Sequence, residues 1–251
     1  MKTESTKACP KSERKEGSAV TAALFRQAAQ AAFASFVTDP AFPCLGAKAA
    51  LNGGSYVLLT YEELACPVTA SSLYADLVAF TESDIAQTSE YASFIAVFQK
   101  PRAIVERTFE RLLWSQLQQL HDLDKDKAKW DPNVSSDPDN PRFSFSIGGH
   151  AYYVIGLHGD SSRLARRFPW PAMVFNPHAQ FEKLRNDGKW KRMQGTIRQR
   201  DIALQGSVNP MLSDFGETSE ARQYSGREVE EKWHPNFQVR GAGSGSCPFA
   251  H

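Results

Sequence analysis

The chain has 251 residues, of which 41% are hydrophobic and 23% are charged. A chain of this length can bury one substantial core, so we predict a single domain over residues 20–240. Its 29 basic and 28 acidic residues give a formal net charge of +1, which excludes the strong overall field of proteins that bind nucleic acid or anionic lipid through net charge. We expect no nucleic-acid partner.

Both ends of the chain have the composition of tails. Residues 1–19 are polar with several lysines, and we predict a disordered N-terminal tail there; residues 241–251 are predicted as a Gly/Ser-rich C-terminal tail. No apolar segment follows the N-terminal lysines, which argues against secretion. The longest apolar runs, such as residues 151–157, are far shorter than the roughly 18 residues of a membrane-spanning helix. We therefore expect a cytoplasmic protein without a membrane partner.

The first half of the chain predicts helices that alternate with strands. Its periodicity favours helices over residues 20–37, 73–80 and 101–121 and strands over residues 55–61 and 91–98. Asp39-Pro40 ends the first helix, and Pro101 is expected at the first position of the third.

The second half begins with a polar segment, residues 122–142, that reads as a surface loop. Residues 143–147 and 151–157 flank Gly148-Gly149 and predict a hairpin whose second strand is central. Asn176-Pro177, after a short strand over residues 173–175, is expected to cap a helix that ends at Gly188. The whole pattern predicts a mixed α/β (α+β) fold, with one mostly apolar central sheet and flanking helices.

The stretch over residues 156–185 is rich in side chains that can bind ligands. His158 directly follows a buried strand, a position that commonly delivers a functional side chain into a crevice. If Ser161-Ser162 caps a helix, then Arg163, Arg166 and Arg167 share one face and can receive anions. The alternative interpretation is that these arginines pair with carboxylates of the chain, such as Asp160, Glu182 or Glu217.

His178 is a second candidate ligand, because the positive end of a helix favours its neutral form; packing against Glu182 would explain it equally well. Residues 201–227 form a loop-rich run whose carboxylates, Asp214, Glu217 and Glu220, can bind a cationic substrate or neutralise the arginines. No GxGxxG, GxxxxGK[ST], GxSxG or HExxH motif occurs. Four cysteines without a CxxC pair indicate reduced thiols.

Several segments form a recognisable set: FPC at residues 42–44, GLHGDSSRLARRF at 156–168, FNPHAQFEKLR at 175–185, the run from Arg200 to Arg227, and the ending CPF at 247–249. Together these segments resemble the YqcI/YcgG family. The resemblance extends over most of the chain from Phe42 onward. It implies a haem b enzyme that uses O2 and electrons from an external reductase to N-hydroxylate a guanidine, with L-arginine as the leading substrate. A non-catalytic haem sensor or carrier is the alternative, and a cofactor-free binding protein is the second.

The resemblance also suggests roles for individual residues. His158 is the expected iron ligand, with His178 as a distal catalytic residue or competing ligand and Cys44 as the third choice. Glu217 or Glu220 is expected to bind the guanidinium. The remaining haem-binding candidates are Arg163, Arg166, Arg167, Tyr224 and Arg227. A homodimer is compatible with this interpretation.

Overall fold

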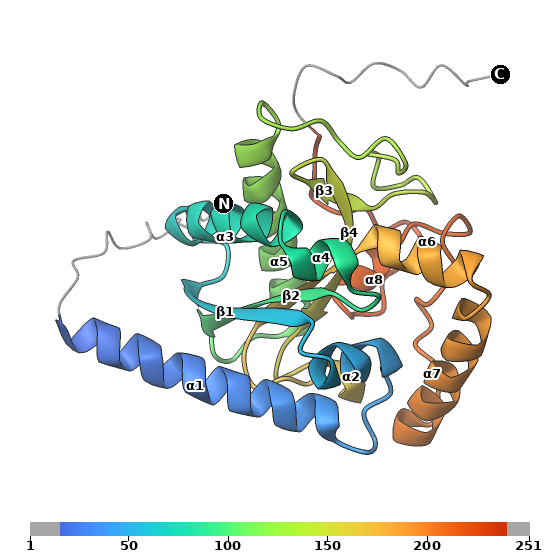
Figure 1. Cartoon of the computed structure of the whole chain (residues 1–251), viewed down its shortest axis with the longest axis horizontal. Helices are drawn as coiled ribbons and strands as arrows, with labels where there is room; N and C mark the ends of the chain where they lie inside the picture. Colours follow the sequence, from blue (N-terminus) through green and yellow to red (C-terminus); the bar gives the residue numbers. More distant parts are fainter. Residues whose placement is uncertain (1–15, 240–251) are drawn as a thin grey trace, which may run out of the picture.

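Five strands form one mixed sheet in the order β1-β2-β5-β4-β3 (Figure 1). The strands are β1 (Tyr56–Glu63), β2 (Ser93–Lys100), β3 (Phe145–Ile147), β4 (His150–Leu157) and β5 (Ala172–Pro177). Strands β1 and β2 are parallel, and the other neighbours are antiparallel. The structure is a computed structural model, and it describes residues 16–239. The predicted mixed α+β fold is confirmed.

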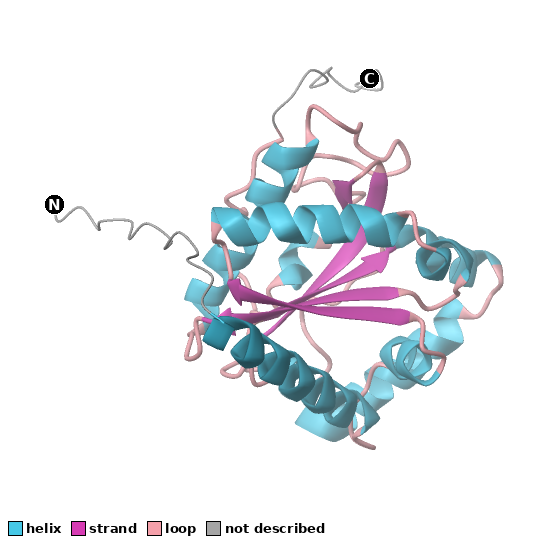
Figure 2. Ribbon diagram, turned by 60° about the vertical axis from the view of Figure 1, so that its left-hand side comes forward, coloured by secondary structure: helices cyan, strands magenta, loops and turns pink. Residues whose placement is uncertain are grey.

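Helices cover both faces of this sheet (Figure 2). They are α1 (Glu16–Thr38), α2 (Leu45–Asn52), α3 (Pro67–Thr81), α4 (Asp84–Thr88), α5 (Glu106–Asp124), α6 (His178–Asn186), α7 (Trp190–Gln205), α8 (Ala221–Tyr224) and a short 3-10 helix, η1 (Leu164–Arg166). Because β1 and β2 are parallel, the chain must cross over between them, and α3 and α4 make that connection.

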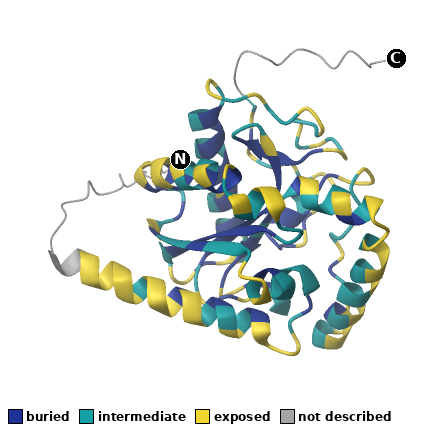
Figure 3. Cartoon of the chain, viewed as in Figure 1, coloured by how far each residue is buried: buried dark blue, intermediate teal, exposed yellow. Residues whose placement is uncertain are grey.

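The alternation of side chains along the strands divides the core into two halves. In β2, Phe94, Ala96 and Phe98 pack with α3 and α5, whereas Ile95 and Val97 pack with α1 on the opposite face. Both faces of β2 are therefore buried, as Figure 3 also shows for the centre of the molecule. A strand buried on both faces reads as a continuous apolar run, which is why β2 is easily recognised in the sequence.

Strand β4 obeys the same alternation, and this decides which of its residues can reach a ligand. Tyr152 and Val154 belong to the core half under α5, whereas Ile155 and Leu157 face the α1 side. Gly156 points toward α5, where a Cβ atom would lie 2.6 Å from Phe109 and 2.8 Å from the carbonyl oxygen of Tyr224. The missing side chain lets α5 and α8 approach the strand.

We expect Gly156→Ala to lower the free energy of unfolding by about 1–3 kcal/mol, because the added methyl group overpacks a rigid contact. Gly195→Ala is the matched control, since Gly195 lies in α7 with open space around it. Alanine there should raise the free energy by about 0.5–1 kcal/mol through helix propensity. Urea unfolding measures both, and equal effects of the two substitutions would contradict the packing argument.

The predicted elements agree with the structure in most places, and the main differences concern α5, α6 and α7. Helix α5 begins at Glu106 rather than at Pro101, and the intervening segment instead places Ile104 in the core. Asn176 lies in β5 and does not cap α6, because its side chain bonds Ser93 and Tyr153. Helix α7 was not predicted at all.

At the ends, α1 already begins at Glu16, so residues 16–19 are helical rather than part of a tail. The predicted tails over 1–15 and 241–251 lie outside the described residues. Within residues 16–239, none of the helices combines the length and the apolar character needed to cross a bilayer. In the same range Cys44 is a free thiol, whereas Cys66 is disulfide-bonded, which corrects the expectation that all cysteines are reduced.

Candidate functional site

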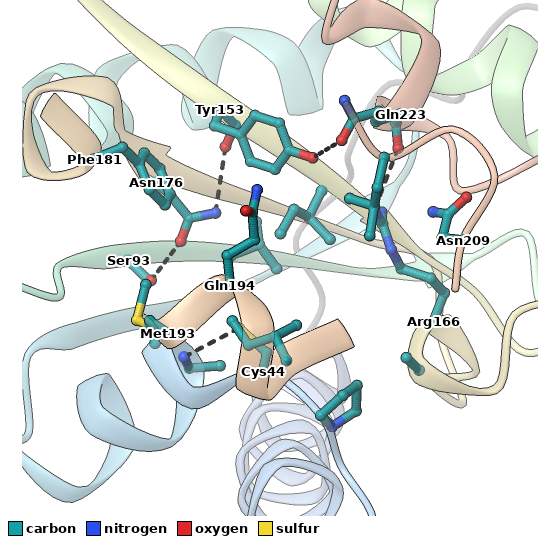
Figure 4. A pocket seen from close by; sticks show the side chains of 18 of the residues that line it. Cys44, Ser93, Tyr153, Arg166, Asn176, Phe181, Met193, Gln194, Asn209 and Gln223 are labelled. Carbon is teal, nitrogen blue, oxygen red and sulfur yellow. Dashed lines mark hydrogen bonds between the residues drawn. The ribbon is translucent and has the colours of Figure 1, made fainter. Parts of the chain in front are cut away.

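A cavity of about 280 Å³ lies on the α1 side of the sheet, between the strands and helices α2, α6 and α7 (Figure 4). Its size is near the lower end of typical small-molecule sites, and most of its lining is apolar. The larger apolar side chains come from elements far apart in the sequence and are Phe33, Phe36, Phe42, Tyr56, Ile95, Ile155, Leu157, Val174, Phe181, Trp190, Ile197 and Phe215. Such a lining suits a flat, apolar ligand.

Cys44 contributes a free thiol to this cavity. It occupies the N-cap of α2, and its Sγ atom accepts a hydrogen bond from the backbone N–H of Ala47 at 3.4 Å. Burial raises the pKa of the thiol, while the amides of Ala47 and Gly46 and the charge of Arg166 oppose that shift. The sulfur therefore sits where backbone dipoles and a cation favour a thiolate once a ligand compensates its burial.

A chain of hydrogen bonds forms the polar wall of the cavity (Figure 4). Ser93 Oγ donates to Asn176 Oδ1 at 2.7 Å, and Asn176 Nδ2 donates to the carbonyl oxygen of Tyr153 at 3.3 Å. The Tyr153 hydroxyl donates to Gln223 Oε1 at 2.6 Å, and the carbonyl oxygen of Gln223 accepts from Arg166. This continuous network fixes the side chains that a ligand would contact.

The three arginines do not share a helical face. The chain forms only the short 3-10 helix η1 here, with Arg163 before it and Arg167 after it, so the predicted helix is absent. Arg163 and Arg166 line the cavity, and Arg167 does not. Arg163 is fully engaged, since it contacts Asp201 at 2.6 Å and the carbonyl oxygen of Ser207 at 2.8 Å.

Arg166 is different, because it is buried without a carboxylate partner among residues 16–239. Its Nη1 donates to the carbonyl oxygen of Gly156 at 3.0 Å, and its Nη2 donates to that of Gln223 at 3.3 Å. Burial lowers its pKa, although an arginine keeps its charge under all ordinary conditions. A buried guanidinium that meets only neutral oxygens favours the binding of an anion at the cavity.

Glu220 supplies a buried carboxyl group to the same cavity. Its Oε1 atom accepts hydrogen bonds from Tyr224 at 2.6 Å and from Ser144 at 2.8 Å. Burial raises the pKa of Glu220 to about 8, against the opposing effects of these two donors and of Arg185. The group is thus mostly protonated near neutral pH and can become a carboxylate when a cation binds.

His178 lines the cavity but offers no accessible nitrogen in this conformation. Its Nε2 atom lies 3.3 Å from Glu182 Oε1, its ring packs on Phe215 at 4.6 Å, and its Nδ1 atom is buried without a hydrogen bond. Burial lowers its pKa, with Glu182 opposing the shift.

His158 does not line the cavity. Its ring stacks on Phe109 of α5 with 4.4 Å between centroids, in the half of the core behind the sheet. Both ring nitrogens are buried, and burial lowers the pKa of the imidazole. A ligand in the cavity is therefore separated from His158 by the sheet.

Three other expected site residues also lie away from the cavity lining. Glu217 is exposed, and its Oε2 atom accepts a hydrogen bond from the amide of Asp214 at 3.1 Å. Arg227 pairs with Glu110 and Glu230 at 2.9 and 3.2 Å. Tyr224 does not line the cavity, but its hydroxyl donates a hydrogen bond to Glu220, which does.

The comparisons with known proteins agree with the resemblance in the sequence. Residues 33–238 match the model of the YqcI/YcgG family. The chain belongs to the YqcI/YcgG family. One relative is described as "Uncharacterized protein YqcI" of Bacillus subtilis (strain 168); it is 27% identical over 200 residues, which cover 76% of this chain and 78% of the relative. No solved structure matches the chain.

Sequence reasoning missed several polar residues of the cavity, most clearly Tyr153 and Asn176. Their signal was present but weak, because a tyrosine and an asparagine interrupt strands whose neighbours are otherwise apolar.

In the part of the chain that the structure describes, no group of three or more His, Cys, Asp or Glu side chains could hold a metal ion. Haem iron needs only one or two axial side chains, so it is a different kind of site.

Proposed function

We propose that this protein is a haem b-dependent N-hydroxylase of a guanidine compound, with L-arginine as the leading substrate. The observation that carries the proposal is the free thiol of Cys44 at the apolar wall of a cavity that a buried guanidinium, Arg166, and a buried carboxyl group, Glu220, also line. Side chains that could ligate iron, bind an anion and bind a cation thus line one cavity. Family membership agrees with this proposal.

The residues present fit haem in three respects. The aromatic and aliphatic lining matches an apolar macrocycle, and Arg166 lacks a counter-charge that a propionate would supply. Cys44 is the side chain that would hold the iron, because His158 lies behind the sheet and both nitrogens of His178 are engaged or buried. We therefore assign the iron ligand to Cys44 rather than to the histidine that the sequence favoured.

Haem with a thiolate ligand supplies O2 activation, as in cytochromes P450. The overall reaction would convert a guanidine N–H, O2, two electrons and two protons into N–OH and water. Glu220 would bind the substrate guanidinium, and Tyr224 and Ser144 would hold the carboxylate in position. The apolar lining would exclude water. The electrons would come from an external reductase in the cytoplasm.

An absorption spectrum of protein purified with added haem tests this proposal. We expect a Soret band at one haem per chain and a change of that band when L-arginine is added, because a substrate next to the iron alters its coordination. Product analysis should then show N-hydroxyarginine only in the presence of O2 and an electron donor.

Two results would contradict the proposal. If the protein takes up no haem after reconstitution, the proposed cofactor is refuted. If the protein binds haem but its spectrum does not change on addition of L-arginine or other guanidines, and no product forms, the sensor or carrier interpretation is favoured.

A further inference from the structure

The stretch that covers the end of α6 and most of α7 is strongly basic in a chain of nearly neutral net charge. Between Lys183 and Arg200 there are seven basic residues and one acidic residue, Asp187. A local excess of this kind creates a positive field even though the whole protein carries a net charge of only +1.

Part of this charge is neutralised within the protein. Lys183 and Lys189 pair with Glu90 at 3.6 and 3.2 Å, and Arg198 lies 3.7 Å from Asp214. Lys191 and Arg192, both exposed, make no ion pair within residues 16–239. Arg200, further along α7, makes none within these residues either, but it is only partly exposed. The exposed unpaired charge of this stretch therefore lies at the start of α7.

The outward side of α7 also exposes an apolar side chain. Ile202 is 48% exposed, which places it among the larger exposed hydrophobic residues of the described chain. It follows Lys191 by about three helical turns, so the two residues share one stripe, and Arg192 lies beside it. The cations and Ile202 thus lie about 16 Å apart along the same side of the helix. A surface that carries both cations and an exposed apolar side chain has the composition of a protein-docking surface more than of a nucleic-acid groove.

The opposite side of the same helix is a wall of the proposed haem cavity. Trp190, Met193, Gln194 and Ile197 of α7 line it. The helix runs along the edge of the molecule, with exposed positions on its outer side (Figures 1 and 3). Because a helix with its side chains is about 10–12 Å across, a protein on the outer side is one helix thickness from the cavity.

We propose that the outward face of α7, made of Lys191, Arg192 and Ile202, docks a small acidic electron-transfer protein of the [2Fe–2S] ferredoxin class. The proposal rests on the haem function, which requires two electrons for each substrate hydroxylated. Two reduced ferredoxins would each be oxidised by one electron, and the two protons of the reaction would come from water. Charge complementarity selects an acidic partner, and Ile202 provides the apolar contact.

Direct binding tests the surface without relying on activity. The oxidised form of an acidic [2Fe–2S] ferredoxin should bind the full chain at low ionic strength, and the affinity should fall as salt rises. Reversing both charges with Lys191→Glu and Arg192→Glu should weaken binding by about tenfold or more and remove most of the salt dependence. Ile202→Ser should weaken binding without changing its salt dependence.

The control variant combines Arg111→Glu with Lys232→Glu. It changes the net charge by the same amount at exposed residues that lie outside α7, and Arg111 belongs to α5 on the other side of the sheet. We expect it to bind ferredoxin nearly as the parent does. The proposal would be overturned if both double variants lost affinity equally or if the parent did not bind ferredoxin. It would also be overturned if the parent bound duplex DNA or phosphatidylserine vesicles more tightly than ferredoxin.

The haem spectrum separates this inference from the proposed function. Ferredoxin binding that depends on Lys191 and Arg192 in a protein without a Soret band would leave the docking surface standing and refute the haem function. An arginine-responsive Soret band in a protein that binds no ferredoxin would do the reverse.

Discussion

Cys44→Ala is expected to abolish the thiolate-type spectrum of the reduced, carbon monoxide-bound protein and to reduce N-hydroxylation to the level without enzyme. The thiol lies at the N-cap of α2 in the cavity wall, and alanine there offers no electron pair to iron. A thiolate ligand gives its ferrous carbonyl complex the spectrum of the cytochromes P450, which imidazole ligation does not reproduce. Absorption spectra of the reconstituted variants under carbon monoxide are the measurement.

Two further variants make this prediction specific. Cys44→His should keep haem bound but move the carbonyl band to the imidazole position. His158→Leu should retain the thiolate spectrum, because His158 packs on Phe109 away from the cavity; its cost should appear as a lower melting temperature. A thiolate spectrum that survives in Cys44→Ala, or one that disappears only in His158→Leu, would refute the assignment.

The choice between His158 and Cys44 shows where sequence reasoning stops. A residue that follows a buried strand can lie on either face, and β4 is apolar on both, so its sequence does not reveal the side to which His158 turns. The register with β5 and the contact with Phe109 settle this. Cys44 reaches the cavity only because packing brings α2 under the sheet, at a point remote in sequence from Glu220.

The sheet itself was largely predictable, and the wall of the cavity was not. Strands β2 and β4 are recognisable because a fully buried strand is continuously apolar. Helix α7 lacks such a signal: its inward residues include Gln194 and Asp201, polar groups that face the cavity or pair with Arg163, and Gly195 interrupts it. A helix that places both polar and apolar side chains on its inward face therefore loses the amphipathic pattern by which core helices are found.

The loop residues of the site follow the same logic. The sequence offered Asp214, Glu217 and Glu220 either as partners of a cationic substrate or as counter-charges of the arginines, and it did not show which of them is buried. Glu220 is 6% exposed and lines the cavity, whereas Glu217 is exposed at the surface. Arg163 was predicted to receive an external anion or to pair with Asp160, Glu182 or Glu217; its observed partner is Asp201, which the sequence did not single out.

Glu220→Gln is expected to weaken the binding of L-arginine at pH 8 by about 10- to 100-fold without changing the haem content. Hydrogen bonds to charged groups contribute about 1.5–3 kcal/mol, and this range converts to that loss of affinity. Glutamine keeps the size of the side chain and can still accept from Tyr224 and Ser144, so the fold should be preserved. Glu217→Gln is the matched control and should bind L-arginine as the parent does.

The dependence on pH gives the sharper form of this prediction. The pKa of Glu220 is raised to about 8 by burial, so below this pH the free protein carries the protonated group. A guanidinium, whose own charge is constant, favours the carboxylate and must displace that proton. The affinity of the parent should therefore rise about tenfold for each pH unit up to 8 and level off above it.

Glu220→Gln has no proton to release at this position, so its affinity should be flat over the same range. The two curves should converge toward pH 6 and separate toward pH 8. Titrations of the arginine-induced spectral change at several pH values provide both curves. A slope that persists in Glu220→Gln would assign the proton, and with it the cation site, to another group in the cavity. The nearest alternative is His178, whose pKa is lowered by burial and would place such a slope at lower pH.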